Sequence, residues 1–340
     1  MKEKGVIVIL LLSPMLSNAA SLGPAEAFNA FIFGNITQSN VDAQGRVAAG
    51  GNVSYTNFMV GTYLSPLNTS INDLVVGGAL TATNLTVEYG SIAIASSTAT
   101  STIMDPTIGG FFSTYGSLEA GAYGQIGAGI ETGGTFTNNY NNSGTVTNLG
   151  VTGRTPIATG VDFASAEASI TQDSAYWATL KTTASTVVSY GSISVTGTNS
   201  TLDVFDINGS DLASANGLTI TAPSGATVLL NINGTADTLS NFQITLDGTD
   251  DYHVLYNFYQ ATSLTDNNVS IEGSLLAPYA AISGSGDHIN GTLIANSLTG
   301  GLEQHLYLFQ GNLPAPVPEP ATWAMFVIGM GLVAIARRRS

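Results

Sequence analysis

Short apolar pulses separated by small polar residues run through most of the chain and predict β-strands. Each pulse is bounded by Gly, Asn, Asp or Pro, the punctuation expected of strands joined by tight turns. In one pulse Val228, Leu230 and Ile232 alternate with Leu229 and Asn231, which is the two-residue period of a strand. The clearest pulses lie at residues 52–60, 74–76, 85–87, 91–95, 191–195, 217–220, 226–232 and 242–246.

One segment has a different period. Residues 161–182 contain no Gly or Pro, and apolar side chains recur there at steps of three and four residues, with a gap at Asp173 and Ser174. The pattern predicts an amphipathic helix of about five turns, capped by Asp162 or Thr159. We expect this helix to cover an open β surface, with a partner-binding helix as the alternative. Its recurring positions are Phe163, Ala166, Ile170, Trp177 and Leu180.

Two β architectures fit these elements. A sandwich needs longer alternating strands joined in Greek keys, whereas a solenoid needs short rungs, many turns and few charges. The chain has 39 glycines and only 9% charged residues, but no strict period. We therefore expect an all-β, Gly-rich, irregular β-solenoid (β-helix) with the helix packed alongside, and a β-sandwich as the alternative.

Charge and cysteine content exclude several classes of protein. Between residues 21 and 316 the basic residues are Arg46, Arg154 and Lys181, against 21 carboxylates, and the whole chain has a net charge of −15. Binding nucleic acid requires clustered Lys and Arg, so nucleic acid is excluded as a partner. The absence of Cys excludes disulfides, thiolate metal sites and cysteine nucleophiles.

Residues 1–20 predict a secretory signal peptide. Lys2 and Lys4 precede an apolar run at residues 5–12 that is too short to span a membrane comfortably. Small residues at Ser17, Ala19 and Ala20 suit cleavage. An uncleaved membrane anchor is the alternative.

The C-terminal end carries a second targeting pattern. A Pro-rich segment at 314–320 excludes helix, 16 uncharged and mostly apolar residues follow at 321–336, and a basic tail at 337–340 ends the chain. As a helix the apolar run spans about 24 Å, short of a roughly 30 Å hydrocarbon core. We predict a marginal transmembrane helix with its basic tail in the cytoplasm. An ordinary C-terminal anchor is the alternative.

This tail resembles the PEP-CTERM sorting signal of Gram-negative bacteria. The resemblance implies recognition by an exosortase at the Pro-Glu-Pro segment, removal of the helix and arginines, and release or transfer to the cell surface. Such proteins tend to occur in bacteria that make extracellular polysaccharide, which implies a biofilm or matrix setting. The residues that carry the resemblance are Val317, Pro318, Glu319, Pro320, Arg337, Arg338 and Arg339.

Between the two signals, residues 21–313 resemble the choice-of-anchor A domain. The resemblance rests on opening blocks at 27–35, 45–52 and 74–78 and closing blocks at 273–278 and 289–295. It implies a surface domain, some of whose relatives are adhesins or collagen-binding proteins, and it transfers no catalytic residue. The layout is also similar to the bacterial ice-binding-like fold. In the most specific block, glycines are expected to allow tight turns and close rung stacking; its marker residues are Gly45, Arg46, Gly50, Gly51 and Asn52.

Candidate chemistry is sparse. His253, His288 and His305 form no metal-binding pattern, and neither a nucleophile elbow nor a phosphate-binding loop occurs. We expect Arg46 to pair with a carboxylate such as Asp42. Acidic clusters in predicted loops suit Ca²⁺, which takes six to eight oxygen ligands. They do not match the EF-hand pattern, and Asp residues that stabilise ordinary turns are the alternative. The candidate calcium ligands are Asp206, Asn208, Asp211, Asp247, Asp250 and Asp251.

These features predict an exported, exosortase-processed protein of the cell surface, outer envelope or extracellular matrix, transiently anchored in the inner membrane. We expect a structural or adhesive role without catalysis, through binding of a polysaccharide or another matrix polymer. Ice binding is the alternative, but Thr-x-Thr at 81–83 and 135–137 does not repeat at a fixed spacing. A glycan hydrolase that uses paired Asp residues is less favoured.

Overall fold

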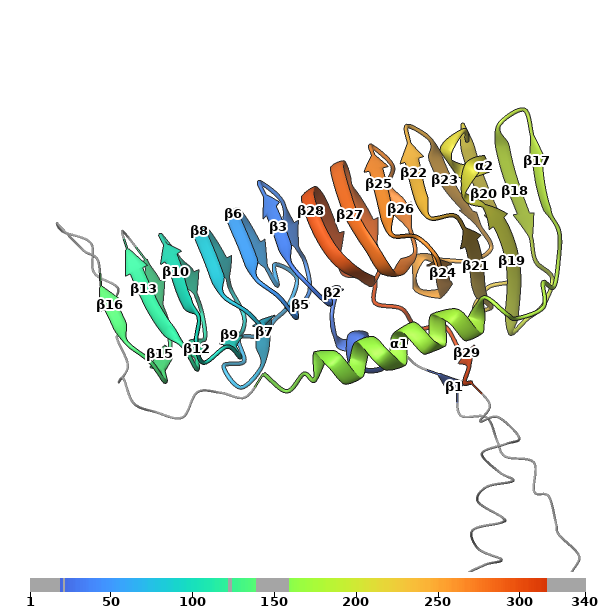
Figure 1. The fold of residues 1–340 in the computed structure, drawn as a ribbon. Coiled ribbons are helices and arrows are strands. Elements are labelled where there is room, and N and C mark those ends of the chain that lie inside the picture. Colours follow the sequence, from blue (N-terminus) through green and yellow to red (C-terminus); the bar gives the residue numbers. More distant parts are fainter. Residues whose placement is uncertain (1–18, 21, 122–123, 139–158, 317–340) are drawn as a thin grey trace, which may run out of the picture.

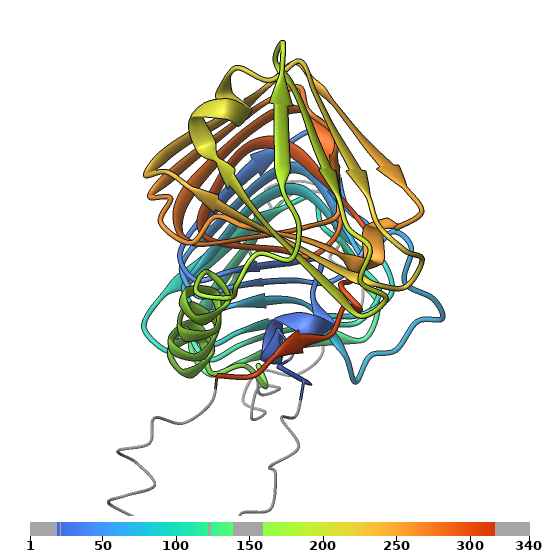
Figure 2. The same cartoon turned by 90° about the vertical axis from the view of Figure 1, so that its right-hand side faces the viewer.

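The strands wind into a solenoid of triangular cross-section (Figures 1 and 2). The computed structural model describes residues 19–20, 22–121, 124–138 and 159–316. Successive coils are joined by parallel ladders, whereas a sandwich would be built from antiparallel sheets. The predicted all-β solenoid is therefore confirmed.

Each coil contributes to three faces. The helix face, which α1 covers, holds β2 (Ala30–Ile32), β5 (Val47–Ala49), β7 (Asn72–Val76), β9 (Ser91–Ile94), β12 (Phe111–Thr114), β15 (Gly129–Thr132), β19 (Leu202–Asn208), β21 (Thr227–Asn233) and β24 (Val254–Asn257). The next face, here called the hydroxyl face, holds β3 (Ile36–Ser39), β10 (Thr100–Met104), β13 (Ser117–Gly121), β16 (Phe136–Asn138), β22 (Ala236–Ser240) and β25 (Ser263–Asn267). The third face holds β4 (Asp42–Ala43), β11 (Thr107–Ile108), β14 (Gln125–Ile126), β18 (Ser192–Thr196), β20 (Gly217–Thr221), β23 (Gln243–Asp247) and β26 (Ile271–Glu272).

Four longer strands turn the corners between faces. β6 (Val53–Val60) and β8 (Leu80–Val87) run from the hydroxyl face into the third face, whereas β27 (Ser274–Asn290) and β28 (Leu293–His305) pass through all three. The remaining short elements are β17 (Thr186–Ser189), which pairs antiparallel with β18, α2 (Gly209–Ala213), η1 (Gly23–Ala27) and η2 (Asp251–His253).

The chain winds outward from the middle of the solenoid and then returns to it. The first half adds coils from β2 through β5, β7, β9 and β12 to β15. The second half begins with β19 and adds β21, β24, β27 and β28. The last coil then stacks on the first, with Phe31 opposite Ile294 (Figure 1). Residues from the two ends of the sequence therefore meet at the centre.

Asparagines turn the chain between the hydroxyl face and the third face. Asn40, Asn57 and Asn84 have φ of 60°, 51° and 53°, a left-handed region that Asn tolerates better than other side chains. Their amides form a row, since Asn57 Nδ2 donates to Asn40 Oδ1 at 2.9 Å and Asn84 Nδ2 donates to Asn57 Oδ1 at 3.1 Å. Asn241 and Asn268 repeat the arrangement in the second half.

The predicted helix is present but shorter than its apolar pattern. α1 spans Phe163–Trp177, 15 residues, rather than 161–182. Asp162 caps it, with Oδ1 accepting from the Ser165 backbone N–H at 3.1 Å. At the other end Asn231 Nδ2 donates to the Trp177 carbonyl at 3.0 Å, which satisfies a helix-end acceptor. The chain then leaves the helix toward β17.

α1 lies along the helix face and touches both halves of the solenoid (Figure 1). Its Ala166, Ile170 and Trp177 are buried. Ser174 Oγ donates to Asn257 Oδ1 at 2.6 Å, and Asn257 Nδ2 returns a bond to the Ser174 carbonyl at 3.0 Å. The helix therefore covers an open β surface, as expected. The buried strand side chains in its cluster are Phe31, Ala48, Val75, Val204, Leu229, Leu255, Leu276 and Ile294.

The two ends of the described chain meet beside α1. β1 (Ala19–Ala20) pairs antiparallel with β29 (Leu313–Pro314), and Trp177 Nε1 donates to the Pro314 carbonyl at 2.9 Å. The predicted signal peptide up to residue 18, the Pro-Glu-Pro segment and the apolar stretch 321–336 lie outside the described residues. Within the part that is described, no helix is both long and apolar enough to cross a membrane.

Candidate functional site

A ladder of side chains crosses the hydroxyl face, with one residue from each coil except the coil that holds α2. It follows from the alternation within each strand: in β3, exposed Thr37 lies between buried Ile36 and buried Gln38. The ladder residues are register partners on neighbouring strands. In spatial order they are Thr238, Thr265, Ser283, Thr299, Thr37, Ser54, Thr81, Thr102, Glu119 and Thr137.

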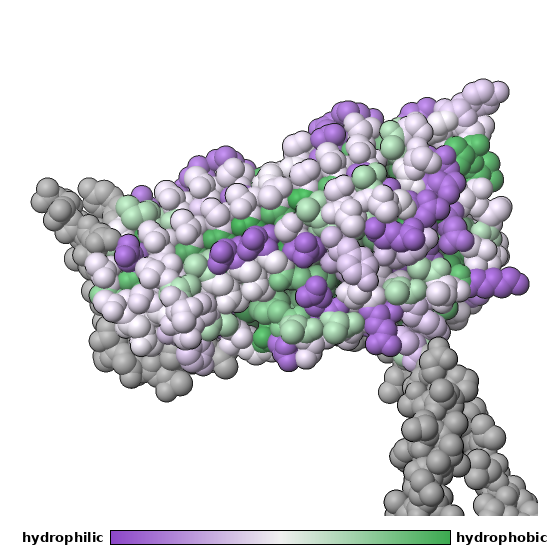
Figure 3. All heavy atoms as spheres, viewed as in Figure 1, coloured by the Kyte–Doolittle hydropathy of each residue, from purple (hydrophilic) through white to green (hydrophobic). Residues whose placement is uncertain are grey.

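A second column lies two residues further along the same strands. Glu119 is the one charged residue in the two columns, and neither contains Lys or Arg. Figure 3 shows the resulting surface as mostly pale, between the hydrophilic and hydrophobic extremes. The members of the second column are Ser240, Asn267, Ser285, Gly301, Ser39, Thr56, Thr83, Met104 and Gly121.

This array can form many hydrogen bonds to an extended ligand. Each Ser or Thr hydroxyl both donates and accepts, and neighbouring strands repeat about every 4.8 Å. The backbone beneath is already paired in parallel ladders, so the hydroxyls are held at a fixed spacing. The face therefore suits a repeating, neutral, polar partner better than a charged one.

The sequence alone did not reveal the ladder, because the coils differ in length. Equivalent corner residues are 17 positions apart between Asn40 and Asn57, but 27 apart between Asn57 and Asn84. The expectation that Thr spacing does not repeat from rung to rung is correct along the chain but wrong in space. A loop between β6 and β7 takes up the difference and leaves the register intact.

The glycines of the 45–52 block lie where coils stack closely. A Cβ on Gly50 would lie 2.2 Å from the Phe33 carbonyl oxygen, and one on Gly51 would lie 2.3 Å from Asn35 Oδ1. Gly45 donates its N–H to Asn29 Oδ1 at 2.9 Å, and Asn52 Oδ1 accepts from the Ala79 N–H at 2.8 Å. The block therefore belongs to the scaffold beneath the surface.

Arg46 pairs with Asp73, not with Asp42. Its Nε lies 3.5 Å from Asp73 Oδ1, whereas Asp42 accepts a hydrogen bond from Thr62 Oγ1. Burial raises the pKa of Asp73 from 3.8 to about 6, against the opposing effect of the Arg46 charge. The pair joins β7 to the loop before β5 and has a structural role.

Residues 21–306 match the family model described as "Putative Ice-binding-like adhesive domain". The chain belongs to the ice-binding-like adhesive domain family. Residues 316–340 match the PEP-CTERM protein-sorting motif, which confirms the predicted sorting signal and implies export. None of the curated proteins compared with the chain matches it.

The candidate calcium ligands of this adhesive domain fall into two separate groups. Asp206 and Asn208 end β19 and Asp211 lies in α2, where Asn208 Nδ2 donates to Asp211 Oδ2 at 3.0 Å. The others lie at the end of β23 and in the connection from β23 to β24, at a different corner of the coil. That second group is Asp247, Asp250 and Asp251.

The structure does not gather these ligands into one site. Asp250 Oδ1 lies 2.6 Å from His253 Nδ1 and is thereby engaged. Across the described residues, no three His, Asp or Glu side chains are arranged to hold a metal ion. Calcium binding by the adhesive domain stays a prediction.

The third face of the domain brings together titratable groups that are distant in the sequence. The rings of His288 and His305 stack with their centroids 4.3 Å apart, because β27 and β28 are adjacent. His305 Nδ1 lies 2.8 Å from Asn290 Oδ1, and Asn290 Nδ2 donates to Glu272 Oε2 at 2.6 Å. Burial, followed by the hydrogen bond and charge of Glu272, raises the pKa of Asp251 to about 7.

Proposed function

We propose that this exported adhesive domain binds a polysaccharide or similar matrix polymer through its hydroxyl face. The sorting motif implies export, and the family supports a surface adhesive role. The observation that carries the proposal is the ladder from Thr238 to Thr137, which presents a hydroxyl from nearly every coil. A polymer laid along the ladder would meet equivalent groups at each strand spacing.

The proposed binding relies on many weak contacts. A single neutral hydrogen bond contributes only about 0.5–1.5 kcal/mol net, since both partners exchange it for water. A ladder that crosses the whole solenoid repeats that contribution along an extended ligand. The mature region also carries few basic residues, which favours a neutral polymer over an acidic one.

We further propose that an exosortase processes the tail at Pro318-Glu319-Pro320 and that a helix at 321–336 holds the chain in the inner membrane until then. The PEP-CTERM match supports the processing step. The choice-of-anchor A relationship is likewise proposed, on the block at residues 45–52. The biofilm or matrix setting is proposed on the PEP-CTERM resemblance.

A pull-down tests the polymer proposal. Residues 19–316, which contain every element of the described fold, would be incubated with host extracellular polysaccharide, cellulose and collagen, each with calcium and with chelator. We expect retention on a polysaccharide without release of soluble sugar. Loss of retention on chelation would assign the acidic loops to Ca²⁺, and no retention on any matrix would contradict the proposal.

Ice binding is the second candidate, because the same ladder is a regular array of Thr and Ser. The family description is consistent with it. Thermal hysteresis of residues 19–316 at micromolar concentration separates the two functions. A clear difference between the melting and freezing points, without retention on a polymer, would favour ice binding over polysaccharide binding.

A non-enzymatic role fits the family. A glycosidase needs two carboxyl groups about 5–10 Å apart across a cleft. Release of soluble sugar in the pull-down, abolished by one Asp→Asn substitution, would overturn this view.

A further inference from the structure

The sheet of the third face is interrupted at one place. β23 pairs with β20, and β26 pairs with β27, but within the described residues no ladder joins β23 to β26. The same two coils are fully paired on the other faces, through β21 with β24 and β22 with β25. The interruption is therefore a local opening in an otherwise continuous stack.

The opening is too narrow for a peptide strand. Some Cα atoms of β23 and β26 lie within 8 Å of each other. Inserting a strand between two others needs about two strand spacings, roughly 9.5 Å. A partner that adds a strand to an exposed edge is thereby excluded at this place, whereas a small polar ligand is not.

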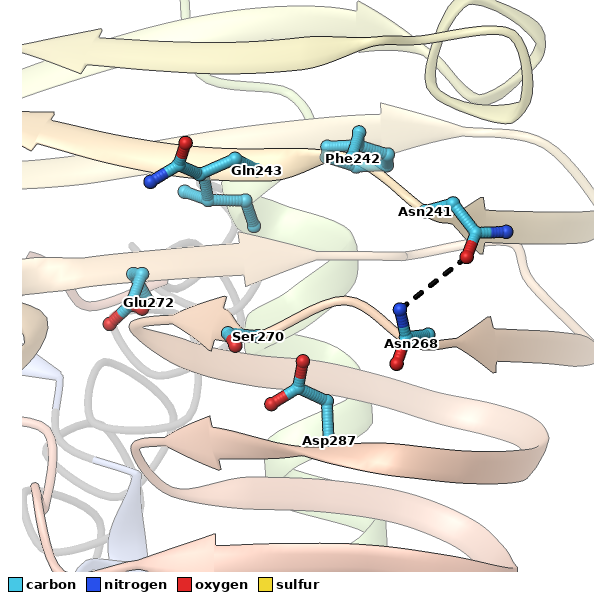
Figure 4. Close-up of a pocket in the computed structure, with 8 residues that line it drawn as sticks. Asn241, Phe242, Gln243, Asn268, Ser270, Glu272 and Asp287 are labelled. Atoms are coloured by element: carbon cyan, nitrogen blue, oxygen red, sulfur yellow. Dashed lines mark hydrogen bonds between the residues drawn. The ribbon is translucent and has the colours of Figure 1, made fainter.

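A hollow of about 410 Å³ occupies the opening (Figure 4). This is within the range of ligand pockets, which are roughly 300–1,000 Å³. Its polar lining combines carboxylates, side-chain amides and a hydroxyl, while two largely buried apolar side chains, Phe242 and Ile244, also line it. The polar lining residues are Asn241, Gln243, Asn268, Ser270, Glu272 and Asp287.

The two carboxylates of the lining are held in place by bonds to residues outside the hollow. Glu272 Oε2 accepts from Asn290 at 2.6 Å, and Asp287 Oδ1 lies 2.8 Å from His288 Nδ1. Figure 4 shows the Asp287 carboxylate beside Ser270, with the Asn268–Asn241 hydrogen bond at one end. Such fixed groups lose little freedom when a ligand binds.

We propose that this hollow is a second saccharide site, which binds one unit of a neutral polysaccharide. The inference rests on the proposed function, whose polymer would reach the hollow from the adjoining face. Carboxylates accept bonds from sugar hydroxyls, and amides such as Gln243 both donate and accept. Glu272 and Asp287, with no Lys or Arg in the lining, repel an acidic sugar.

Isothermal titration calorimetry of residues 19–316 tests the site. The probes are cellohexaose, the hexamer of N-acetylglucosamine and the hexamer of galacturonic acid. We expect at least one neutral hexamer to bind at least tenfold more tightly than the acidic one. Gln243→Ala with Asp287→Ala should weaken that binding at least tenfold, whereas Thr107→Val, on β11 of the same face but outside the hollow, should leave it unchanged.

Charge variants give a second readout. Glu272→Gln with Asp287→Asn keeps hydrogen-bonding groups but removes both charges, so the preference for neutral over acidic hexamer should shrink. Three results would each overturn the second site. Hexamer affinity could be the same for the wild type and the hollow variants, the acidic hexamer could bind more tightly than the neutral ones, or neither neutral hexamer could bind. Retention on the insoluble polymer is measured separately, so the proposed function can stand or fall independently.

Discussion

Individual corner residues carry the turn geometry of each coil, and Asn57 is the clearest case. Its φ of 51° is unfavourable for a side chain other than Asn, and its amide bonds both Asn40 and Asn84. Asn57→Ala should lower the free energy of unfolding by about 2 kcal/mol. Alanine in the left-handed conformation costs roughly 1–2 kcal/mol, and the hydrogen bonds of the amide are also lost. Urea denaturation measures this.

Asn57→Gly is the matched control for the turn. Gly adopts the same φ without strain but also loses the amide row. Asn57→Gly should therefore lower the free energy of unfolding by less than Asn57→Ala does. Equal losses for the two variants would show that the left-handed geometry contributes nothing.

A buried carboxyl, Asp266, makes stability depend on pH. Burial raises its pKa from 3.8 to about 7, while its backbone hydrogen bond from Val269 opposes the shift. Between these two pKa values the carboxyl keeps its proton in the folded state and releases it in the unfolded state. The free energy of unfolding therefore falls as pH rises from about 4 to 7. Asp266→Asn should therefore be more stable than the wild type at pH 8.

The advantage of Asp266→Asn should shrink as pH falls and be small by pH 4, where the folded wild type is protonated and the unfolded state, with a pKa of 3.8, is partly protonated. Thermal melts from pH 4 to 8 give the comparison, with Asp247→Asn at the exposed end of β23 as the control. A constant difference across this range would rule out titration of Asp266 as the cause.

At the scale of elements, α1 is a lid on the helix face. Ile170 is 2% exposed and packs against strands from the solenoid. Ile170→Ala should cost about 2–5 kcal/mol, the usual range for such a truncation in a core. Ala168→Ser, on the exposed side of the same helix, should change stability by less than about 0.5 kcal/mol.

Far-UV circular dichroism should show native strand content for Ile170→Ala at low temperature, because the interior of the coils forms a separate cluster. Loss of strand signal together with helix signal would mean that α1 is required for the coils to stack.

The elements show what the sequence could and could not predict. Strands and α1 follow from local periods of two and 3.6 residues, which any stretch of chain reveals. The apolar pattern continues to Leu180 and so predicts a longer helix, whereas α1 ends at Trp177, whose carbonyl accepts a hydrogen bond from Asn231. The ladder, the His288–His305 stack and the Arg46–Asp73 pair depend on register between coils of unequal length, which no local pattern encodes.

For the whole molecule, the distinctive feature is the meeting of the first and last coils. Thr37 and Thr299 are register partners although they come from opposite ends of the chain. Neighbouring strands lie about 4.8 Å apart, within the Cα separation of 4.4–6.8 Å that suits disulfides. Because the chain has no Cys, Thr37→Cys with Thr299→Cys should form a single intramolecular disulfide, visible on non-reducing gels.

Thr37→Cys with Ser283→Cys is the control for this pairing. Ser283 lies one strand beyond Thr299, so its Cα is roughly 9.5 Å from that of Thr37 and beyond disulfide reach. Cross-linking of the control, or failure of the first pair to cross-link in folded protein, would contradict the stacking of the first and last coils.

The central claim is that the hydroxyl face is the adhesive surface. Its most direct test is the affinity of a triple variant for the polysaccharide that retains the wild type. Thr37→Val, Thr81→Val and Thr299→Val remove three ladder hydroxyls with little change in shape, and should lower affinity at least tenfold. Thr86→Val, Thr107→Val and Thr219→Val on the third face should leave it unchanged. Equal affinity for wild type and the hydroxyl-face variant would contradict the claim.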